Sequence, residues 1–137
     1  MSATAIVRDL LGNYAPLTAL VPNAKIYAGQ IPQNTTLPAI SVTAVGGGGD
    51  KVRTTARNFV KMMREERVQV TVLAKNYMLM ERILKAASLG PGVHSGTVAG
   101  FRVNSVLPEG LGPYIGPAGD EIHEQSRDFM VTFVEAN

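Results

Sequence analysis

The sequence predicts a single α+β domain over residues 1–137, with a mostly antiparallel sheet and two helices packed on one of its faces. Three observations lead to this prediction. Several short segments alternate apolar and polar residues, a helical segment lies between two groups of such strands, and the connections between them have hairpin length. A chain of 137 residues buries enough surface for one core without a disulfide or a metal ion.

The N-terminal segment has the periodicity of an amphipathic helix. Its apolar side chains recur at helical spacing at Ile6, Val7, Leu10 and Leu11. Ser2 or Thr4 can cap this helix, and Gly12 ends it. Pro16 suits the first position of a second short helical turn. This turn directs three apolar side chains inward: Leu17, Leu20 and Val21.

A longer helix is predicted from its cap at Asn76 to about Leu89. It carries a broad apolar face formed by Tyr77, Leu79, Met80, Ile83, Leu84, Ala86 and Ala87. The run Gly90-Pro91-Gly92 is a strong helix stop. We therefore expect this helix to cover the sheet.

The predicted strands are recognised by alternation. They span residues 26–28, 39–45, 68–74, 97–99, 101–107 and about 123–135. The clearest is 68–74, which places Val68, Val70, Val72 and Ala74 on one face. Gly100 is expected to turn a tight hairpin, and the last strand to bury Phe129, Val131 and Phe133.

The composition excludes several classes of protein. The chain contains no cysteine, which excludes a disulfide framework, a thiolate zinc site and a cysteine nucleophile. No secretory signal and no apolar run of membrane-spanning length is present. A net charge of +2 is too small to indicate nucleic-acid binding by the whole domain. We expect a protein made in the cytoplasm with no membrane partner.

Motifs for catalysis are equally scarce. The run Gly46–Gly49 is followed by Asp50 and Lys51 rather than the Gly-Lys-Ser/Thr of a phosphate-binding loop, so a flexible hinge is favoured. His94 and His123 lack a second ligand at helical spacing. The acidic residues near His123, which are Asp120, Glu121 and Glu124, show no cation-loop spacing and favour a solvated edge. We expect no enzyme, no metal and no cofactor.

The segment 46–67 is predicted to be a flexible basic excursion between strands. Its six basic residues are Lys51, Arg53, Arg57, Lys61, Arg64 and Arg67. The stretch from Phe59 to Met63 suits either a helix or one arm of a long hairpin. Three interpretations remain open: an arm that orders when subunits dock, a plain solvated loop, and a contact with DNA phosphates. Met62 and Met63 suit the docking arm, as adaptable apolar contacts. Phe59 is the segment's only aromatic residue, so stacking on single-stranded bases is not supported.

A second candidate contact surface lies in the glycine- and proline-rich loop 108–120. Its apolar residues are Leu111, Tyr114 and Ile115. Apolar side chains on such a loop either mark a contact surface or fold back over the sheet, and the sequence leaves both open. The candidate interface therefore comprises Lys51, Arg53, Arg57, Phe59, Lys61, Met62, Arg64, Leu111, Tyr114 and Ile115.

An ordered set of motifs resembles the tail-completion (tail-terminator) family of long-tailed bacteriophages. In the N-terminal half, 16–21 (PLTALV), 25–32 (KIYAGQIP) and 37–42 (LPAISV) resemble the family's P-x-L-x-x-L-V, R-I-Y…P and L-P-Y-V-x-V. In the second half, 67–72 (RVQVTV) resembles its R-x-x-V-x-V strand, and the helix, hairpin and closing strand follow in the family's order. The chain departs from the family at Ala39, where an aromatic residue is usual, and in its longer basic excursion.

The resemblance implies a structural virion protein at the head-proximal end of the tail. Members of this family form a ring, often a homo-hexamer, that caps the tail tube and joins it to the head connector, with no cofactor. Its partners would be further copies of itself, the tail tube protein, the connector and, through the excursion, genomic DNA. A head-closure or neck protein is an alternative within the same class, and a small nucleic-acid-binding module is an alternative outside it.

Overall fold

The computed structural model describes residues 2–45, 53–54, 61–90, 94–116 and 122–136. Three α-helices are present in these ranges, together with a short 3-10 turn at Asn23–Lys25. The helices are α1 (Ser2–Gly12), α2 (Ala15–Thr18) and α3 (Tyr77–Ala86). The strands are β1 (Ile26–Ala28), β2 (Ala39–Ala44), β3 (Arg53–Thr54), β4 (Lys61–Ala74), β5 (Gly96–Val98), β6 (Phe101–Leu111) and β7 (His123–Ala136).

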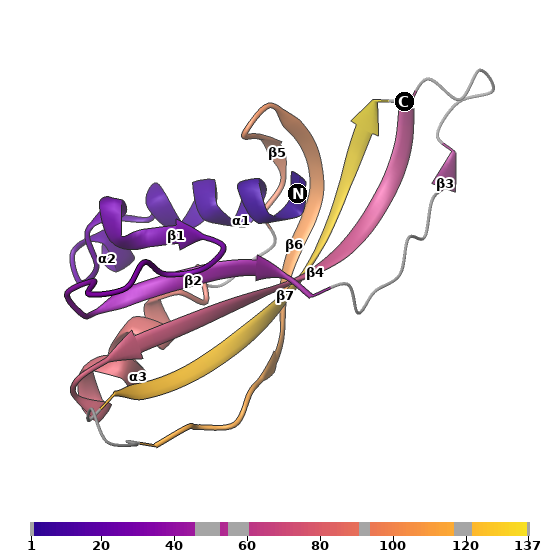
Figure 1. The fold of residues 1–137 in the computed structure, drawn as a ribbon. Coiled ribbons are helices and arrows are strands. Elements are labelled where there is room, and N and C mark those ends of the chain that lie inside the picture. Colours follow the sequence, from indigo (N-terminus) through magenta and orange to yellow (C-terminus); the bar gives the residue numbers. More distant parts are fainter. Residues whose placement is uncertain (1, 46–52, 55–60, 91–93, 117–121, 137) are drawn as a thin grey trace.

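The strands form one curled sheet in the order β1-β2-β4-β7-β6-β5, with β3 paired to β4 (Figure 1). All pairings are antiparallel except that of β1 with β2, which is parallel. The predicted α+β class with a mostly antiparallel sheet therefore agrees with the structure. The parallel pair makes the sheet mixed.

The longest ladder joins β4 to β7 over all 14 residues of each strand, from Lys61 opposite Ala136 to Ala74 opposite His123. Figure 1 shows this ribbon extending away from the helices at the upper right. We name the extension the arm, defined as Lys61–Arg67 of β4 paired with Met130–Ala136 of β7. The boundary predicted for the basic excursion was therefore wrong, because 61–67 forms regular strand.

One core lies between the helices and one face of the sheet. The inward residues of β4 from Val68 to Ala74 are fully buried, and α1 and α3 contribute to the same apolar cluster. The helical contribution includes Ile6, Val7, Leu11, Met80, Ile83 and Leu84. Phe129 and Phe133 of β7 are the largest fully buried side chains, as the alternation predicts. The two predicted helices thus cover one face, and α2 adds Leu17 to the core.

Helix α3 begins at its predicted cap. The Oδ1 atom of Asn76 accepts hydrogen bonds from the backbone N–H groups of Met78 (2.8 Å) and Leu79 (3.2 Å). The helix ends at Ala86, three residues before the predicted end. The prediction that Tyr77 is buried was also wrong, because its side chain is 40% exposed.

The β5–β6 hairpin turns at Ala99 and Gly100, as predicted. Both residues have positive φ, 53° and 85°, which is the geometry of a two-residue turn matched to the twist of the strands. Strand β6 then continues to Leu111, so the loop predicted to start at Pro108 starts later. Pro108 is tolerated because only β7 pairs with β6 at this point within the described residues.

Candidate assembly surfaces

The basic residues predicted to form an interface are only partly described. Lys51, Arg57 and Phe59 lie outside the described residues. The backbones of Arg53 and Thr54 pair with Met63 and Met62. Of the two alternatives for 59–63, the described part, 61–63, therefore forms an arm of a hairpin and not a helix. The strand β4 contains Lys61, Met62 and Arg64. Arg64 is half-buried opposite Phe133, and therefore lies on the same face of the ladder as the core residues.

The three apolar residues predicted in the second segment are exposed. Leu111 and Ile115 are each 53% exposed, and Tyr114 is 40% exposed. Of the two possibilities left open, the structure shows the exposed arrangement. The residues do not share one face, because Leu111 pairs with Arg127 and Ile115 with Glu124, whose side chains point to opposite sides of β7.

Backbone hydrogen bonds hold this segment against β7. The N–H of Gly112 donates to the carbonyl of Ser126 (2.8 Å), and Ile115 and Glu124 exchange bonds of 2.8 and 3.1 Å. The side-chain amide of Gln125 donates to the carbonyl of Gly112 (2.9 Å). The segment 111–116 therefore continues the β6–β7 pairing and presents its side chains from a fixed backbone.

An aromatic cluster connects this segment to the start of α3. The rings of Tyr77 and Tyr114 meet edge to face with centroids 5.1 Å apart. The hydroxyl of Tyr114 is hydrogen-bonded to Nδ1 of His123, and the hydroxyl of Tyr77 donates to Glu81 (3.0 Å). These contacts explain why Tyr77 lies at the surface. Met78, beside it, is 64% exposed and extends the apolar surface.

A groove of about 330 Å³ lies between α3 and the β6–β7 pair. We name it the α3 groove; its lining residues are Glu81, Leu84, Lys85, Ser88, Leu111, Gln125 and Arg127. Most of its polar groups are satisfied internally. Glu81 accepts from Tyr77, Ser88 donates to the carbonyl of Leu84 (3.2 Å), and Gln125 bonds Gly112.

Arg127 is the groove residue that carries a buried polar atom without a partner in the described part of the chain. Its Nε atom is buried and has no hydrogen-bond partner among the described residues. It pairs with Val70 of β4, so it lies on the face that carries the core. The sequence analysis did not single out Arg127. The signal that identifies it is its position in the alternation, because residue 127 falls on the same face of the strand as the inward residues Phe129, Val131 and Phe133.

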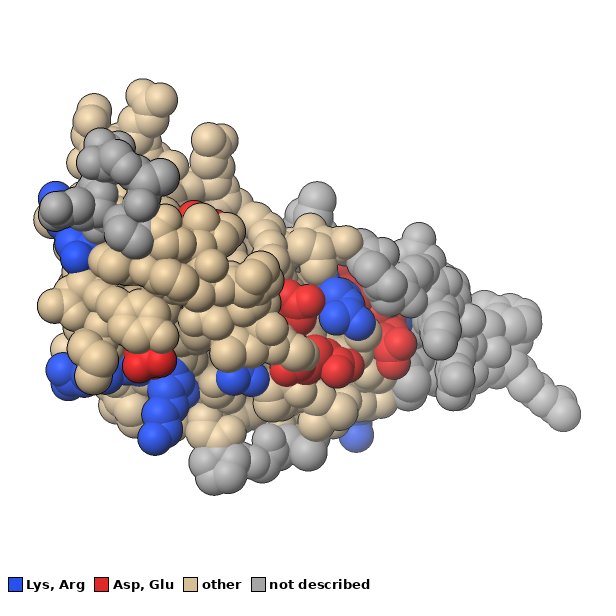
Figure 2. Space-filling model, turned by 90° about the horizontal axis from the view of Figure 1, so that it is seen from below, with Lys and Arg blue, Asp and Glu red and all other residues tan. Residues whose placement is uncertain are grey.

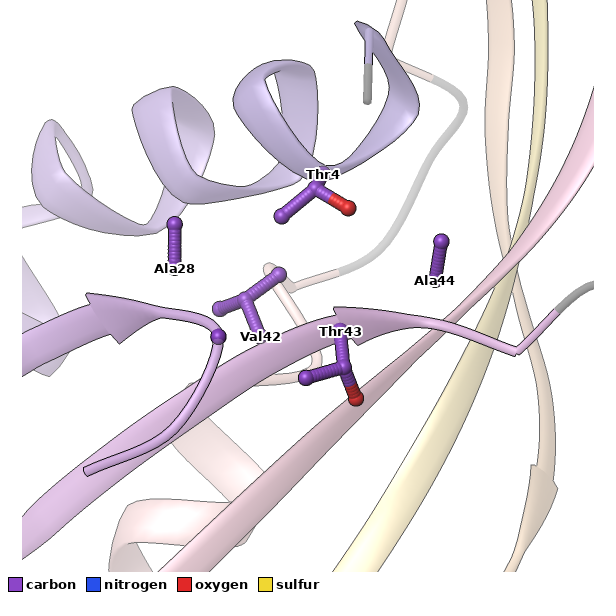
Figure 3. A pocket seen from close by; sticks show the side chains of 6 residues that line it. Thr4, Ala28, Val42, Thr43 and Ala44 are labelled. Atoms are coloured by element: carbon purple, nitrogen blue, oxygen red, sulfur yellow. The ribbon is translucent and has the colours of Figure 1, made fainter.

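A second hollow has an apolar lining. The notch of about 340 Å³ between α1 and the β1–β2 pair is lined by Thr4, Ala28, Gly29, Val42, Thr43 and Ala44. Figure 3 shows Thr4 and Val42 pointing toward each other across this notch, with Thr43 pointing to the opposite face of β2. A lining of small side chains without an ionisable group suits an apolar contact better than a chemical reaction.

The two histidines have local partners. Nε2 of His94 lies 3.0 Å from the carbonyl oxygen of Leu89, and His123 bonds Tyr114. Of the predicted acidic edge, Glu124 is half-buried in β7, and Asp120 and Glu121 lie outside the described residues. Within the described ranges, no three histidine, aspartate or glutamate side chains come close enough to hold a metal ion.

The described surface mixes both signs of charge. Figure 2, which views the molecule from below, shows basic and acidic side chains interspersed on the visible face. Among the described residues, no helix combines the length and apolar character needed to cross a membrane.

Comparison with known proteins identifies a solved structure with a similar fold. No family model and no curated protein matches the sequence. Among solved structures, the chain is similar to a chain in the virion of a native gene transfer agent particle, with a TM-score of 0.66. The match covers 96% of this chain and 94% of the other at 13% sequence identity. At this identity the likeness shows a shared fold over nearly the whole length of both chains.

Proposed function

We propose that this chain is a structural virion protein of a long-tailed bacteriophage, and specifically a tail-terminator protein. In this role, copies of the chain form a ring, a homo-hexamer in the family it resembles, at the head-proximal end of the tail. The ring caps the tail tube protein and contacts the head connector. The proposal assigns the chain no catalytic reaction and no cofactor.

The observation that carries the proposal is the whole-length similarity in fold to a chain of a virion. Coverage above nine-tenths in both directions means that the likeness extends over the full domain rather than a shared sheet alone. The ordered motifs that resemble the tail-completion family support the same class independently, because they come from the sequence and not from the fold. The similarity in fold supports a virion protein, and the motifs support the terminator role within that class.

The distribution of contact surfaces suits a ring. A ring requires each subunit to offer two different faces, because head-to-tail contacts close by rotation. The α3 groove and the aromatic cluster lie at one end of the β4–β7 ladder, and the arm lies at the other (Figure 1). Exposed apolar residues gather at the first of these ends, at Tyr77, Met78, Leu111, Tyr114 and Ile115.

The proposal is tested by measuring assembly. Light scattering of the purified protein over a range of concentrations gives the mass of the particle, and electron microscopy of the same samples shows its shape. We expect rings, either of the protein alone or at one end of tail tubes mixed with it. Arrest of tube elongation by the added protein is the functional readout.

Three outcomes separate the alternatives. Rings that bind one end of the tube support the terminator. Rings that bind the portal side of heads but ignore tubes indicate a head-closure or neck protein instead. A monomer that ignores both, and binds DNA with a strong salt dependence, contradicts a virion ring and favours the nucleic-acid-binding alternative.

A further inference from the structure

We propose that Arg127 in the α3 groove receives a carboxylate from the arm of a neighbouring copy of this chain, Glu65 or Glu66. The inference rests on the proposed ring and deepens it, because it names the residues of the contact between subunits. It also gives a role to a half-buried arginine whose buried Nε atom has no partner in the described part of its own subunit.

The first step concerns Arg127 within one subunit. The guanidinium remains charged at all physiological pH values and has five N–H donors. Within the described residues it makes neither a hydrogen bond nor an ion pair, although its Nε atom is buried. A buried donor without an acceptor is costly, so an arginine at this position is explained best by a partner that arrives from outside the subunit.

The groove defines the chemistry of that partner. Lys85 lines the same hollow, so a second positive charge lies near Arg127. The groove's one carboxylate, Glu81, already accepts a hydrogen bond from Tyr77. Leu84 and Leu111 supply apolar walls. A carboxylate carried on an extended segment fits this combination, because arginine binds carboxylates in a planar two-bond geometry.

The arm offers such carboxylates. Glu65 and Glu66 are half-buried in β4, and within the described part of the chain neither makes a hydrogen bond or an ion pair. As neighbours on a strand, Glu65 and Glu66 point to opposite faces of the sheet. Whichever face a neighbouring subunit docks on, one of the two carboxylates points toward it. The arm also carries Lys61, Arg64 and Arg67, so the match is local: two carboxylates without a partner in the described part of their own subunit face an unpaired guanidinium. This local match selects a second copy of the chain as the occupant.

The positions of the two surfaces agree with ring closure. Arg127 lies four residues from the His123 end of β7, and the arm forms the other end of the same ladder. A contact between the arm of one copy and the α3 groove of the next is head-to-tail. An open chain of subunits joined in this way keeps one free groove at one end and one free arm at the other until the ring closes.

The central experiment is a charge exchange read out by light scattering and microscopy of the purified protein. We expect Arg127→Glu to weaken association between subunits by roughly thirtyfold or more, the effect of breaking a buried charge pair. Combining it with Glu65→Arg or with Glu66→Arg restores rings in one of the two cases. Arg82→Glu is the matched control, because Arg82 is an exposed arginine of α3 outside the groove lining, and it should leave rings intact.

A second variant distinguishes an interface residue from a structural one. Arg127→Met keeps the length of the side chain and removes the buried donor, so the isolated subunit should unfold at an unchanged or higher temperature while association weakens. An Arg127→Met variant that unfolds earlier but assembles normally would overturn the inference.

Failure of the inference and failure of the proposed function are distinguishable. If the unmodified protein forms no ring alone or on tubes, the proposed function fails and the inference fails with it. If it forms rings that Arg127→Glu does not weaken, or that neither exchange variant restores, the ring stands and the assignment of this contact is wrong.

Discussion

Nη1 of Arg67 lies 3.2 Å from Oδ2 of Asp128 and joins β4 to β7 on the face of the sheet opposite to the helices. The two residues are diagonal neighbours, because Asp128 pairs directly with Gln69. Their side chains are 33% and 27% exposed, so water still reaches the pair. On the same face, the hydroxyl groups of Thr71 and Ser126 are hydrogen-bonded at 2.9 Å.

The first prediction concerns the strength of this ion pair. Because both charges are partly solvated, we expect a coupling free energy of about 0.5–1 kcal/mol. The measurement is a double-mutant cycle with Arg67→Ala, Asp128→Ala and the double variant, using denaturant unfolding. The coupling should shrink at high salt. A coupling of several kcal/mol that salt leaves unchanged would show that the pair is desolvated in solution.

The second prediction concerns the cap of α3. Asn76→Ala removes the acceptor for two backbone N–H groups of the first turn, and should lower the free energy of unfolding by about 1 kcal/mol. Lys75→Ala is the matched control, since Lys75 is an exposed neighbour that caps nothing. Equal effects of the two variants would contradict a capping role for Asn76.

The third prediction concerns the β5–β6 turn. Gly100 has a φ of 85° and nothing within 4 Å of the position where a Cβ would stand, so Gly100→Ala introduces backbone strain without a clash. We expect a loss of about 1 kcal/mol in the free energy of unfolding. Gly110 in β6 also has open space but no positive φ, so Gly110→Ala isolates the conformational effect. Equal free energies of unfolding of the two variants would contradict the prediction, because they would mean that the backbone at residue 100 adopts another φ without cost.

The regular parts of this fold were predictable because burial imposes a period. Alternation located the inward residues of β4 from Val68 to Ala74 and those of β7 from Phe129 to Phe133. The cap at Asn76 and the turn at Gly100 were predictable because local backbone chemistry determines them. The strands depend on the burial of one face, and the cap and the turn depend on residues close in sequence.

The sequence left the arm undecided at 59–63 and did not predict strand at 64–67, for the corresponding physical reason. Residues 64–67 are Arg-Glu-Glu-Arg, and a pattern of charges at consecutive positions predicts no strand. The pairing of β4 with β7 makes this segment a strand, and that partner lies more than 60 residues away in sequence. Long-range pairing of this kind leaves no local period to detect.

The candidate site was predictable only in part. Leu111, Tyr114 and Ile115 were identified because apolar residues in a glycine- and proline-rich segment are unusual. The partnership of Tyr77 with Tyr114, and the groove beside them, depends on the packing of α3 against the β6–β7 pair. Periodicity placed Tyr77 in the core because its ring is apolar, but its hydroxyl group requires a polar partner at the surface.

The last prediction concerns the titration of Tyr77. The hydrogen bond to Glu81, together with the negative charge of that carboxylate, raises the pKa of Tyr77 above its ordinary value of 10.0. The folded state therefore retains this proton more tightly than the unfolded state does. The resulting stabilisation is complete below pH 10 and is lost as the pH rises through the raised pKa. The free energy of unfolding should therefore fall more steeply with rising pH in the unmodified protein than in Tyr77→Phe.

The measurement is an ultraviolet titration of phenolate in the chain, which has four tyrosines. Tyr77→Phe should remove the component with the raised pKa. Glu81→Gln should keep four phenols and return that component toward the ordinary value, because an amide carries no charge. Tyr27→Phe is the control, since Tyr27 lies in β1 away from the cluster. A titration unchanged by Glu81→Gln would contradict the Tyr77–Glu81 hydrogen bond in solution.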